Sequence, residues 1–88
     1  MGELSKLPNI GKVLEEQLHA VGVTTCQELE QLGAEATWLK IQEIDSSACI
    51  HRLLALEGAI RGVKKTEIPG NRKAELKEFY EWKKRGHK

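Results

Sequence analysis

The residues best suited to chemistry lie near the start of the chain, in the segment Leu-Pro-Asn-Ile-Gly-Lys at positions 7–12. A tight turn here should open directly onto a helix, whose first backbone amides would point outward without an intrahelical acceptor. Gly11 removes the Cβ that would obstruct a ligand, and Asn9 tolerates a positive φ better than other non-glycine residues. Outward amides and the charge of Lys12 favour an anion. The candidate phosphate-binding residues are therefore Asn9, Ile10, Gly11 and Lys12.

The same turn has a second interpretation without any ligand. It could simply reverse the chain, with Ile10 in the core and Gly11 needed for the geometry. Glu15 and Glu16 follow closely, within a Debye length of about 8 Å at physiological salt, and would partly cancel the attraction of Lys12. The phosphate-binding hypothesis and the purely structural one both stay open.

Positive charge is concentrated in the last third of the chain. Residues 1–60 hold four basic and nine acidic side chains, a net charge of −5, whereas residues 61–88 hold ten and four, a net charge of +6. A row of such cations can follow a phosphate backbone. The residues expected to extend the contact are Lys64, Lys65, Arg72 and Lys73. Alternatively, pairs four residues apart, such as Lys77 with Glu81, would form an ordinary solvated helix surface.

The sequence carries no pattern typical of catalysis or of a bound cofactor. Cys26 and Cys49, with His19, His51 and His87, never form the close pairs that metal sites use. A glycine-rich nucleotide loop, a nucleophile elbow and a paired set of acids are also missing. We therefore expect no enzyme, no catalytic residue, no metal and no cofactor.

The elements that must position these residues are all expected to be helices. Strand patterns are nearly absent, and apolar residues recur at three- and four-residue intervals. The first helix should run from about Lys12 to Val21. Thr25 with Glu28 forms a capping-box pattern for a short second helix, which should end at Gly33.

The second half of the chain predicts three more helices. Trp38, Ile41 and then Ile44 line one side of the third, and the Asp-Ser-Ser cluster at 45–47 should break it and supply the N-cap of the fourth. Residues 49–62 are apolar on most sides, as in a central helix surrounded by others. Within it, Gly58 should be compensated by close backbone packing.

Pro69 and Gly70 precede a fifth helix that should dock with Leu76 and Phe79 facing inward. The length of 88 residues fits one domain. We therefore predict a compact all-α, five-helix domain over residues 1–88, with residues 83–88 frayed. Without a secretory leader or a long apolar run, a cytoplasmic location is expected.

The segment at 7–12 resembles the helix-hairpin-helix motif, in which backbone amides hold a DNA phosphate without reading sequence. The usual pattern has two glycines, and Asn9 stands in place of the first. Pro-Asn-Ile-Gly-Lys is also similar to a hairpin in the RNA polymerase alpha chain, within its C-terminal domain, which is helical and binds the DNA minor groove. That similarity covers about six residues.

A wider resemblance covers nearly everything from Leu4 to Phe79. Its pieces are the segment at 7–12, Gly-Val-Thr-Thr at 22–25, Leu-Gly-Ala at 32–34, Trp-Leu-Lys at 38–40, Leu-Leu-Ala-Leu-Glu-Gly-Ala-Ile-Arg-Gly at 53–62 and Ile-Pro at 68–69. Together they resemble the bacterial TfoX/Sxy C-terminal domain family, and this resemblance implies a SAM-like or helix-hairpin-helix-like fold. Relatives often carry a tryptophan shortly before the Ile-Pro step, where this chain has Lys64, Lys65 and Thr66.

The resemblance implies a regulator of competence genes that acts in transcription regulation. The partners it implies are the DNA phosphate backbone, a transcription factor such as the cyclic-AMP receptor protein, or a second copy of the chain. Neither a membrane nor a small-molecule substrate is expected. Relatives linked to competence usually carry an additional N-terminal TfoX domain, and this sequence begins almost directly at the C-terminal one. The alternative function is a protein-interaction or self-association module without nucleic-acid binding.

Overall fold

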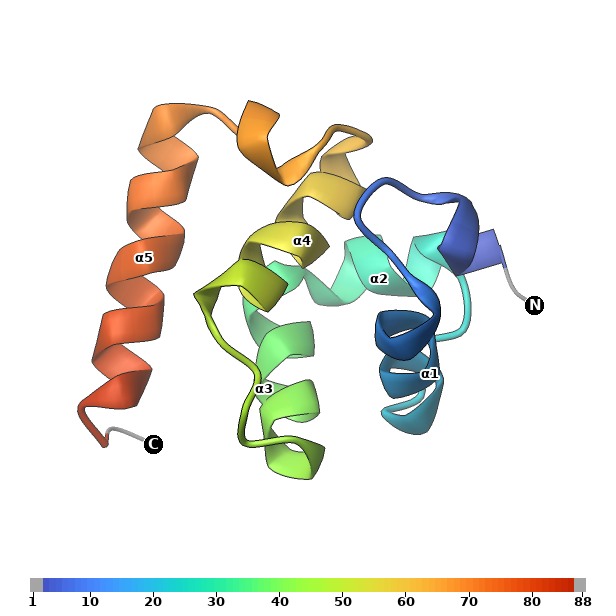
Figure 1. Cartoon of the computed structure of the whole chain (residues 1–88), viewed down its shortest axis with the longest axis horizontal. Helices are drawn as coiled ribbons and strands as arrows, with labels where there is room; N and C mark the ends of the chain where they lie inside the picture. Colours follow the sequence, from blue (N-terminus) through green and yellow to red (C-terminus); the bar gives the residue numbers. More distant parts are fainter. Residues whose placement is uncertain (1–2, 87–88) are drawn as a thin grey trace.

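The computed structural model describes residues 3–86, and within that range every regular element is a helix (Figure 1). Its elements are the 3-10 helix η1 (Glu3–Lys6), the α-helices α1 (Lys12–Ala20), α2 (Cys26–Leu32), α3 (Ala34–Ile44) and α4 (Ile50–Arg61), the 3-10 helix η2 (Lys65–Glu67) and α5 (Gly70–Lys84). The all-α, five-helix fold is confirmed. Lys83 and Lys84 of the predicted frayed tail belong to α5, and residues 87–88 lie outside the described range.

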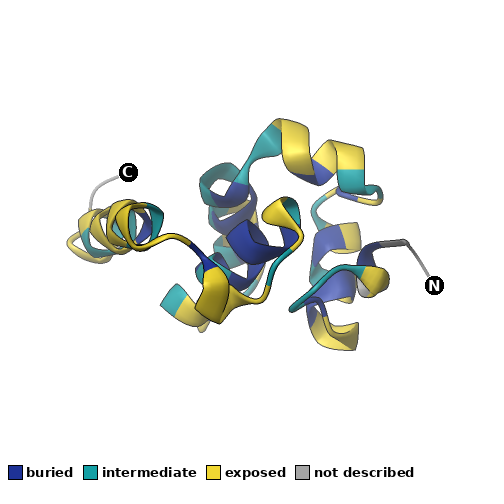
Figure 2. Ribbon diagram, turned by 90° about the horizontal axis from the view of Figure 1, so that it is seen from above, coloured by how far each residue is buried: buried dark blue, intermediate teal, exposed yellow. Residues whose placement is uncertain are grey.

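Helix α4 lies in the middle of the molecule, with α1 on one side and α5 on the other (Figure 1). It packs against α2, α3, α5 and η2. Figure 2 shows buried positions gathered around it, whereas α5 is largely exposed. The buried residues of α4 are Leu53, Ala55, Leu56, Glu57, Gly58 and Ala59. The prediction of a central helix over 49–62 is therefore confirmed.

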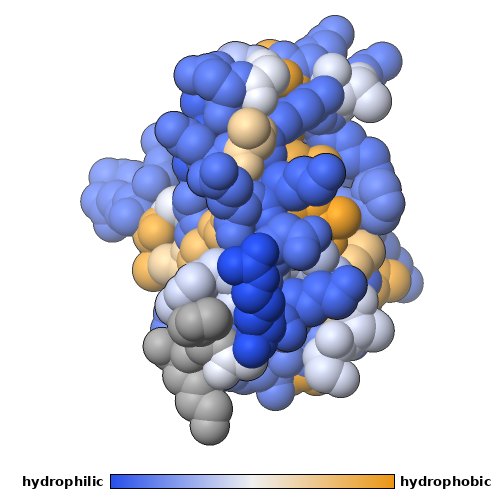
Figure 3. Space-filling model, turned by 90° about the vertical axis from the view of Figure 1, so that its left-hand side faces the viewer, coloured by the Kyte–Doolittle hydropathy of each residue, from blue (hydrophilic) through white to orange (hydrophobic). Residues whose placement is uncertain are grey.

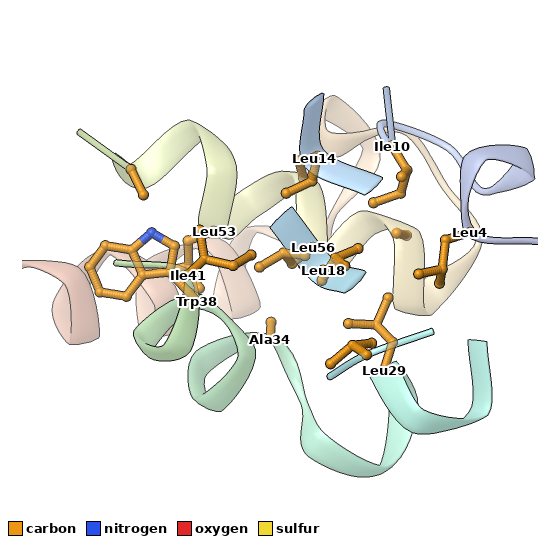
Figure 4. Packing of buried hydrophobic residues seen from close by; sticks show 14 of the residues in the cluster. Leu4, Ile10, Leu14, Leu18, Leu29, Ala34, Trp38, Ile41, Leu53 and Leu56 are labelled. Carbon is orange, nitrogen blue, oxygen red and sulfur yellow. The ribbon is translucent and has the colours of Figure 1, made fainter. Parts of the chain in front are cut away.

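One apolar core is shared by the five α-helices. Figure 4 shows Leu14 and Leu18 of α1, Leu29 of α2 and Leu56 of α4 converging on it. Fully burying one such leucine contributes about 1.5–3 kcal/mol. Ile10 is 6% exposed and belongs to the same cluster, so the turn at 7–12 is anchored to the core by its own apolar side chain.

A capping box and a glycine determine where α2 starts and ends. The predicted capping box is present, because the Thr25 hydroxyl accepts from the Glu28 amide at 3.1 Å and the Glu28 carboxylate accepts from the Thr25 amide at 3.2 Å. Gly33, at φ +87°, both ends α2 and starts α3. A single residue therefore turns the chain between these helices.

Two details of the prediction were wrong. The N-cap of α4 is Cys49, not a residue of the 45–47 cluster. Asp45 instead ends α3, and its carboxylate accepts hydrogen bonds from Arg52, from Gln17 and from Ser47, so it ties helices together. Ile44 does not join the core, since its side chain is 54% exposed on the last turn of α3.

Helix α5 is attached to the body through its apolar side. Leu76 is fully buried, and Phe79 and Tyr80 meet the ring of Trp38 edge-on at 5.9 and 5.7 Å between ring centroids. The Trp38 indole donates to the carbonyl oxygen of Cys49 at 3.3 Å. Leu76 and Phe79 face inward as predicted.

Candidate nucleic-acid interface

The turn at 7–12 has the backbone conformation that its residue types predict. Asn9 has φ +70°, and no other non-glycine residue in the described part of the chain has a positive φ. Gly11 is the N-cap of α1 in an extended conformation and makes no side-chain capping bond. The first intrahelical bond runs from the Glu15 amide to the Gly11 carbonyl at 2.9 Å. The earlier amides of α1 therefore have no intrahelical acceptor.

The side chain of Asn9 connects the turn to a distant segment. Its Nδ2 donates to the carbonyl oxygen of Val63 at 3.0 Å and, at 3.5 Å, to that of Ala55. Its Oδ1 accepts from the Lys65 amide at 3.1 Å. These bonds use both ends of the amide group, so the Asn9 side chain joins the turn to the segment that follows α4.

Gly58 makes this connection sterically possible. A Cβ at position 58 would lie 2.5 Å from Asn9 Nδ2 and 2.7 Å from the Val63 carbonyl oxygen. No real side chain fits at such distances, so only glycine allows the Asn9 amide to pass over α4. The predicted close packing at Gly58 is confirmed, and its partners are the hairpin and the segment after α4.

The result is a continuous surface made from two parts of the chain. Lys64 and Lys65 are exposed, and together with the turn they border a groove of about 600 Å³. The groove is lined by Pro8, Asn9, Gly62, Val63, Lys64, Lys65, Thr66 and Glu67. The structure thus brings Asn9, Lys64 and Lys65 together, whereas Ile10, Gly11 and Lys12 of the same turn do not line this groove.

Acidic side chains limit the positive potential of this surface. Glu67 lies in the groove and accepts from the Lys64 amide at 3.3 Å. Glu16 is exposed on the first turns of α1, whereas Glu15 is buried. In the lining of the groove, Lys64 and Lys65 therefore face one carboxylate, Glu67, while Lys12 and Glu16 are both exposed on α1.

Arg72 is held in a network on the other side of α4. Its guanidinium pairs with Glu57 at 3.1 Å, with Glu35 at 2.8 Å and with Glu75 at 3.1 Å. Glu57 also pairs with Arg61 at 2.6 Å. Burial would raise the pKa of Glu57, but the hydrogen bonds from Arg72 and Arg61 lower it below its ordinary value. The phosphate contact of Arg72 stays a prediction, and in this structure its guanidinium pairs with three carboxylates instead.

Lys73 lies between η2 and a separate groove formed by α4 and α5. Its Nζ donates to the Thr66 carbonyl oxygen at 3.3 Å, which places it beside η2, but it also lines a separate groove between α4 and α5. Sequence reasoning missed this division between Lys73 and the lysines at 64 and 65. It also missed the partners of Asn9, for which the only indication was a glycine inside an otherwise regular helix.

Residues 3–86 offer neither a metal site nor a membrane span. In that range, no group of three or more His, Cys, Asp or Glu side chains could hold a metal ion. None of the described helices has the length and apolar character needed to cross a membrane.

Comparisons with known proteins agree along most of the chain. The family model described as the TfoX C-terminal domain matches residues 1–80. Protein Sxy of Escherichia coli (strain K12) is 37% identical over 76 residues, which cover 86% of this chain and 36% of that protein. The chain thus spans about a third of the length of this curated relative.

Solved structures of similar chains have the same fold. An uncharacterized protein from Listeria monocytogenes, in a triclinic crystal form, is 45% identical with a TM-score of 0.91, covering 96% of this chain and 94% of that one. A protein of unknown function from Listeria monocytogenes, in a tetragonal form, is also 45% identical, with a TM-score of 0.89 and coverage of 91% and 98%.

Proposed function

The chain belongs to the TfoX C-terminal domain family, and we propose that it is a non-enzymatic regulatory module that contacts the phosphate backbone of DNA without reading its sequence. In this role it would act in transcription regulation, and its similarity to Protein Sxy suggests the regulation of competence genes. The observation that carries the proposal is the joining of the hairpin to Lys65 through Asn9.

The joined surface has the two components that phosphate binding requires. The open amides at the start of α1 offer short-range hydrogen-bond donors with a fixed direction, and the helix dipole adds to their positive potential. Lys12, Lys64 and Lys65 supply full charges that attract the backbone at longer range. None of these groups has the fork geometry that reads a base edge. The expected contact is therefore independent of sequence.

The arrangement also explains why the first glycine of the motif can be replaced. Glycine adopts a positive φ without strain, and Asn9 adopts one here, at φ +70°. The asparagine side chain then adds the bonds to Val63 and Lys65 that glycine cannot make. This chain therefore gains a link between the turn and the segment that carries Lys64 and Lys65.

The proposal is tested by titrating the chain into a labelled DNA duplex of about two helical turns and following fluorescence anisotropy. Binding should weaken as salt rises from about 50 to about 200 mM, with a log–log slope of roughly −2 to −3 for two to three phosphate contacts. Two duplexes of unrelated sequence should bind with the same affinity. Failure of both to bind at low salt would refute the proposal.

A variant at Gly11 separates phosphate binding from folding. Gly11 lies at φ −92° and a Cβ there would meet nothing within 4 Å, so Gly11→Asp is sterically allowed. Aspartate is a better N-cap than glycine, so the fold should be at least as stable, but its carboxylate would occupy the amides that a phosphate needs. We expect about a tenfold or greater loss of DNA affinity.

Gln27→Glu is the matched control, because it makes the same change of charge at an exposed position on α2. It should leave DNA affinity within about twofold of the parent. Equal losses in Gly11→Asp and Gln27→Glu would show that only overall charge matters, and the hairpin would then have no specific part in binding. Lys64→Glu with Lys65→Glu should flatten the salt slope by about two.

A further inference from the structure

A second groove lies between α4 and α5, away from the turn at 7–12. It has a volume of about 280 Å³ and is lined by Ile50, Leu54, Lys73, Lys77, Tyr80 and Glu81. Figure 3 shows apolar surface on either side of the hydrophilic outer face of α5. Ile50 and Leu54, one turn apart on α4, and Tyr80 of α5 remain half-buried there. The apolar floor is therefore incompletely covered.

The size and the apolar lining of the groove suit one or two large apolar side chains. Binding pockets for small molecules usually measure about 300–1,000 Å³ and enclose most of the ligand. This groove lies at the lower limit of that range, and it is bounded on two sides by helices of the chain. One or two large apolar side chains presented by another polypeptide would fill it.

The charged residues at the rim of the groove indicate the charge expected of a partner. Lys73 and Lys77 lie one helical turn apart on α5 and both line the groove, against one carboxylate, Glu81. Lys77 is exposed, and within residues 3–86 it forms no ion pair, not even with Glu81 four residues later. Lysines beside an apolar floor are complementary to carboxylates that flank apolar side chains.

We propose that this groove binds an amphipathic segment of a partner protein, with one or two large apolar side chains on Ile50, Leu54 and Tyr80 and flanking Asp or Glu side chains on Lys73 and Lys77. This is the helix-in-groove mode of peptide recognition. The hairpin contacts the opposite, C-terminal end of α4, so the module could hold DNA and a protein partner at the same time.

The test uses two synthetic helical peptides and the full chain labelled with ¹⁵N and ¹³C. Both peptides carry leucines along one face, flanked by glutamates in one peptide and by lysines in the other. We expect the acidic peptide to bind about tenfold tighter, because each rim pair changes from attraction to repulsion. The chemical-shift changes that it causes in the methyl and amide resonances of the chain should cluster at Ile50, Leu54 and Tyr80.

Lys77→Glu should remove most of the preference for the acidic peptide. Lys84→Glu is the matched control, since it makes the same charge change on the same helix at an exposed position outside the groove. The proposal is overturned by equal binding of the two peptides, by shift changes elsewhere, or by equal effects of the two variants. It is also overturned if the same resonances move with the concentration of the chain alone, because the occupant is then a second copy.

No DNA is present in this titration, so its failure leaves the phosphate-binding proposal unaffected. Conversely, a loss of DNA binding in Gly11→Asp would not change the response of the groove to the acidic peptide.

Discussion

The side chain of Asn9 lies over Gly58, with its Nδ2 only 2.5 Å from the position that a Cβ at residue 58 would take. Two residues from opposite halves of the chain therefore depend on each other. Asn9 holds the hairpin against the end of α4, and the absence of a side chain at Gly58 leaves the space for it. The candidate interface rests on this pair.

Gly58→Ala should lower the free energy of unfolding by about 1–3 kcal/mol, because the added methyl group collides with Asn9 and with the carbonyl oxygen of Val63, which is backbone and cannot swing away. In an open helix the same change would add about 1 kcal/mol of stability. Gly70→Ala is the control, since a Cβ there meets nothing within 4 Å. Urea denaturation measures both, and an equally stable Gly58→Ala would contradict this close packing.

Asn9→Gly should lower the free energy of unfolding by about 1–3 kcal/mol, since the bonds to Val63 and Lys65 disappear while the positive φ stays accessible. Asn9→Ala should cost about 1 kcal/mol more, because alanine is strained at φ +70°. Thermal and urea unfolding give the order of the three proteins. If alanine were tolerated better than glycine, backbone conformation would not be what limits this position.

Arg72→Gln should lower the free energy of unfolding by about 3 kcal/mol, because it leaves the buried carboxylate of Glu57 with one cation, Arg61, in place of two. Lys84→Gln, which removes an exposed charge from the same helix, should change stability by less than about 0.5 kcal/mol. Similar urea midpoints for the two variants would show that the network contributes little.

Acid should destabilise the fold through two carboxylates whose pKa values are depressed. Hydrogen bonds from Ser47, Arg52 and Gln17 hold the pKa of Asp45 well below its usual range. The pKa of Glu57 is also lowered, because its bonds to Arg72 and Arg61 outweigh the opposing effect of burial. A depressed folded-state pKa stabilises the fold above the unfolded-state pKa, and this stabilisation is lost as the pH falls through the folded value.

The free energy of unfolding should therefore be level above about pH 5 and decline below it. Glu57→Gln should make that decline shallower, whereas Glu78→Gln, at an exposed position on α5, should leave its slope unchanged. Urea titrations at successive pH values give the slope. The same slope in both variants would remove Glu57 from the explanation.

Features that depend on near neighbours in sequence were predictable. The capping box joins Thr25 to Glu28, three residues apart, and the residue types alone indicate it. The same holds for the burial of Ile10 within the turn. In contrast, the bond from Asn9 to Val63 spans 54 residues and the one from Lys65 spans 56, and no local pattern contains both ends.

The misassigned N-cap has a related cause. Asp45, Ser46 and Ser47 have the right residue types to cap α4, but the Asp45 carboxylate is drawn to Arg52 of α4 and Gln17 of α1. These tertiary hydrogen bonds, and not the local sequence, decide that Asp45 links helices and does not cap α4. The role of Arg72 was likewise undetermined by sequence, since its partners Glu35 and Glu57 come from two other helices.

The link between Asn9 and Lys65 also determines when the interface forms during synthesis. The hairpin sequence leaves the ribosome early, but its asparagine has no partners until α4 and the segment after it have emerged and packed. Contacts of such long sequence separation form late in folding. A nascent chain, or one cut before Val63, would carry every residue of the motif without the fixed turn. The proposed phosphate-binding surface is thus a property of the finished fold.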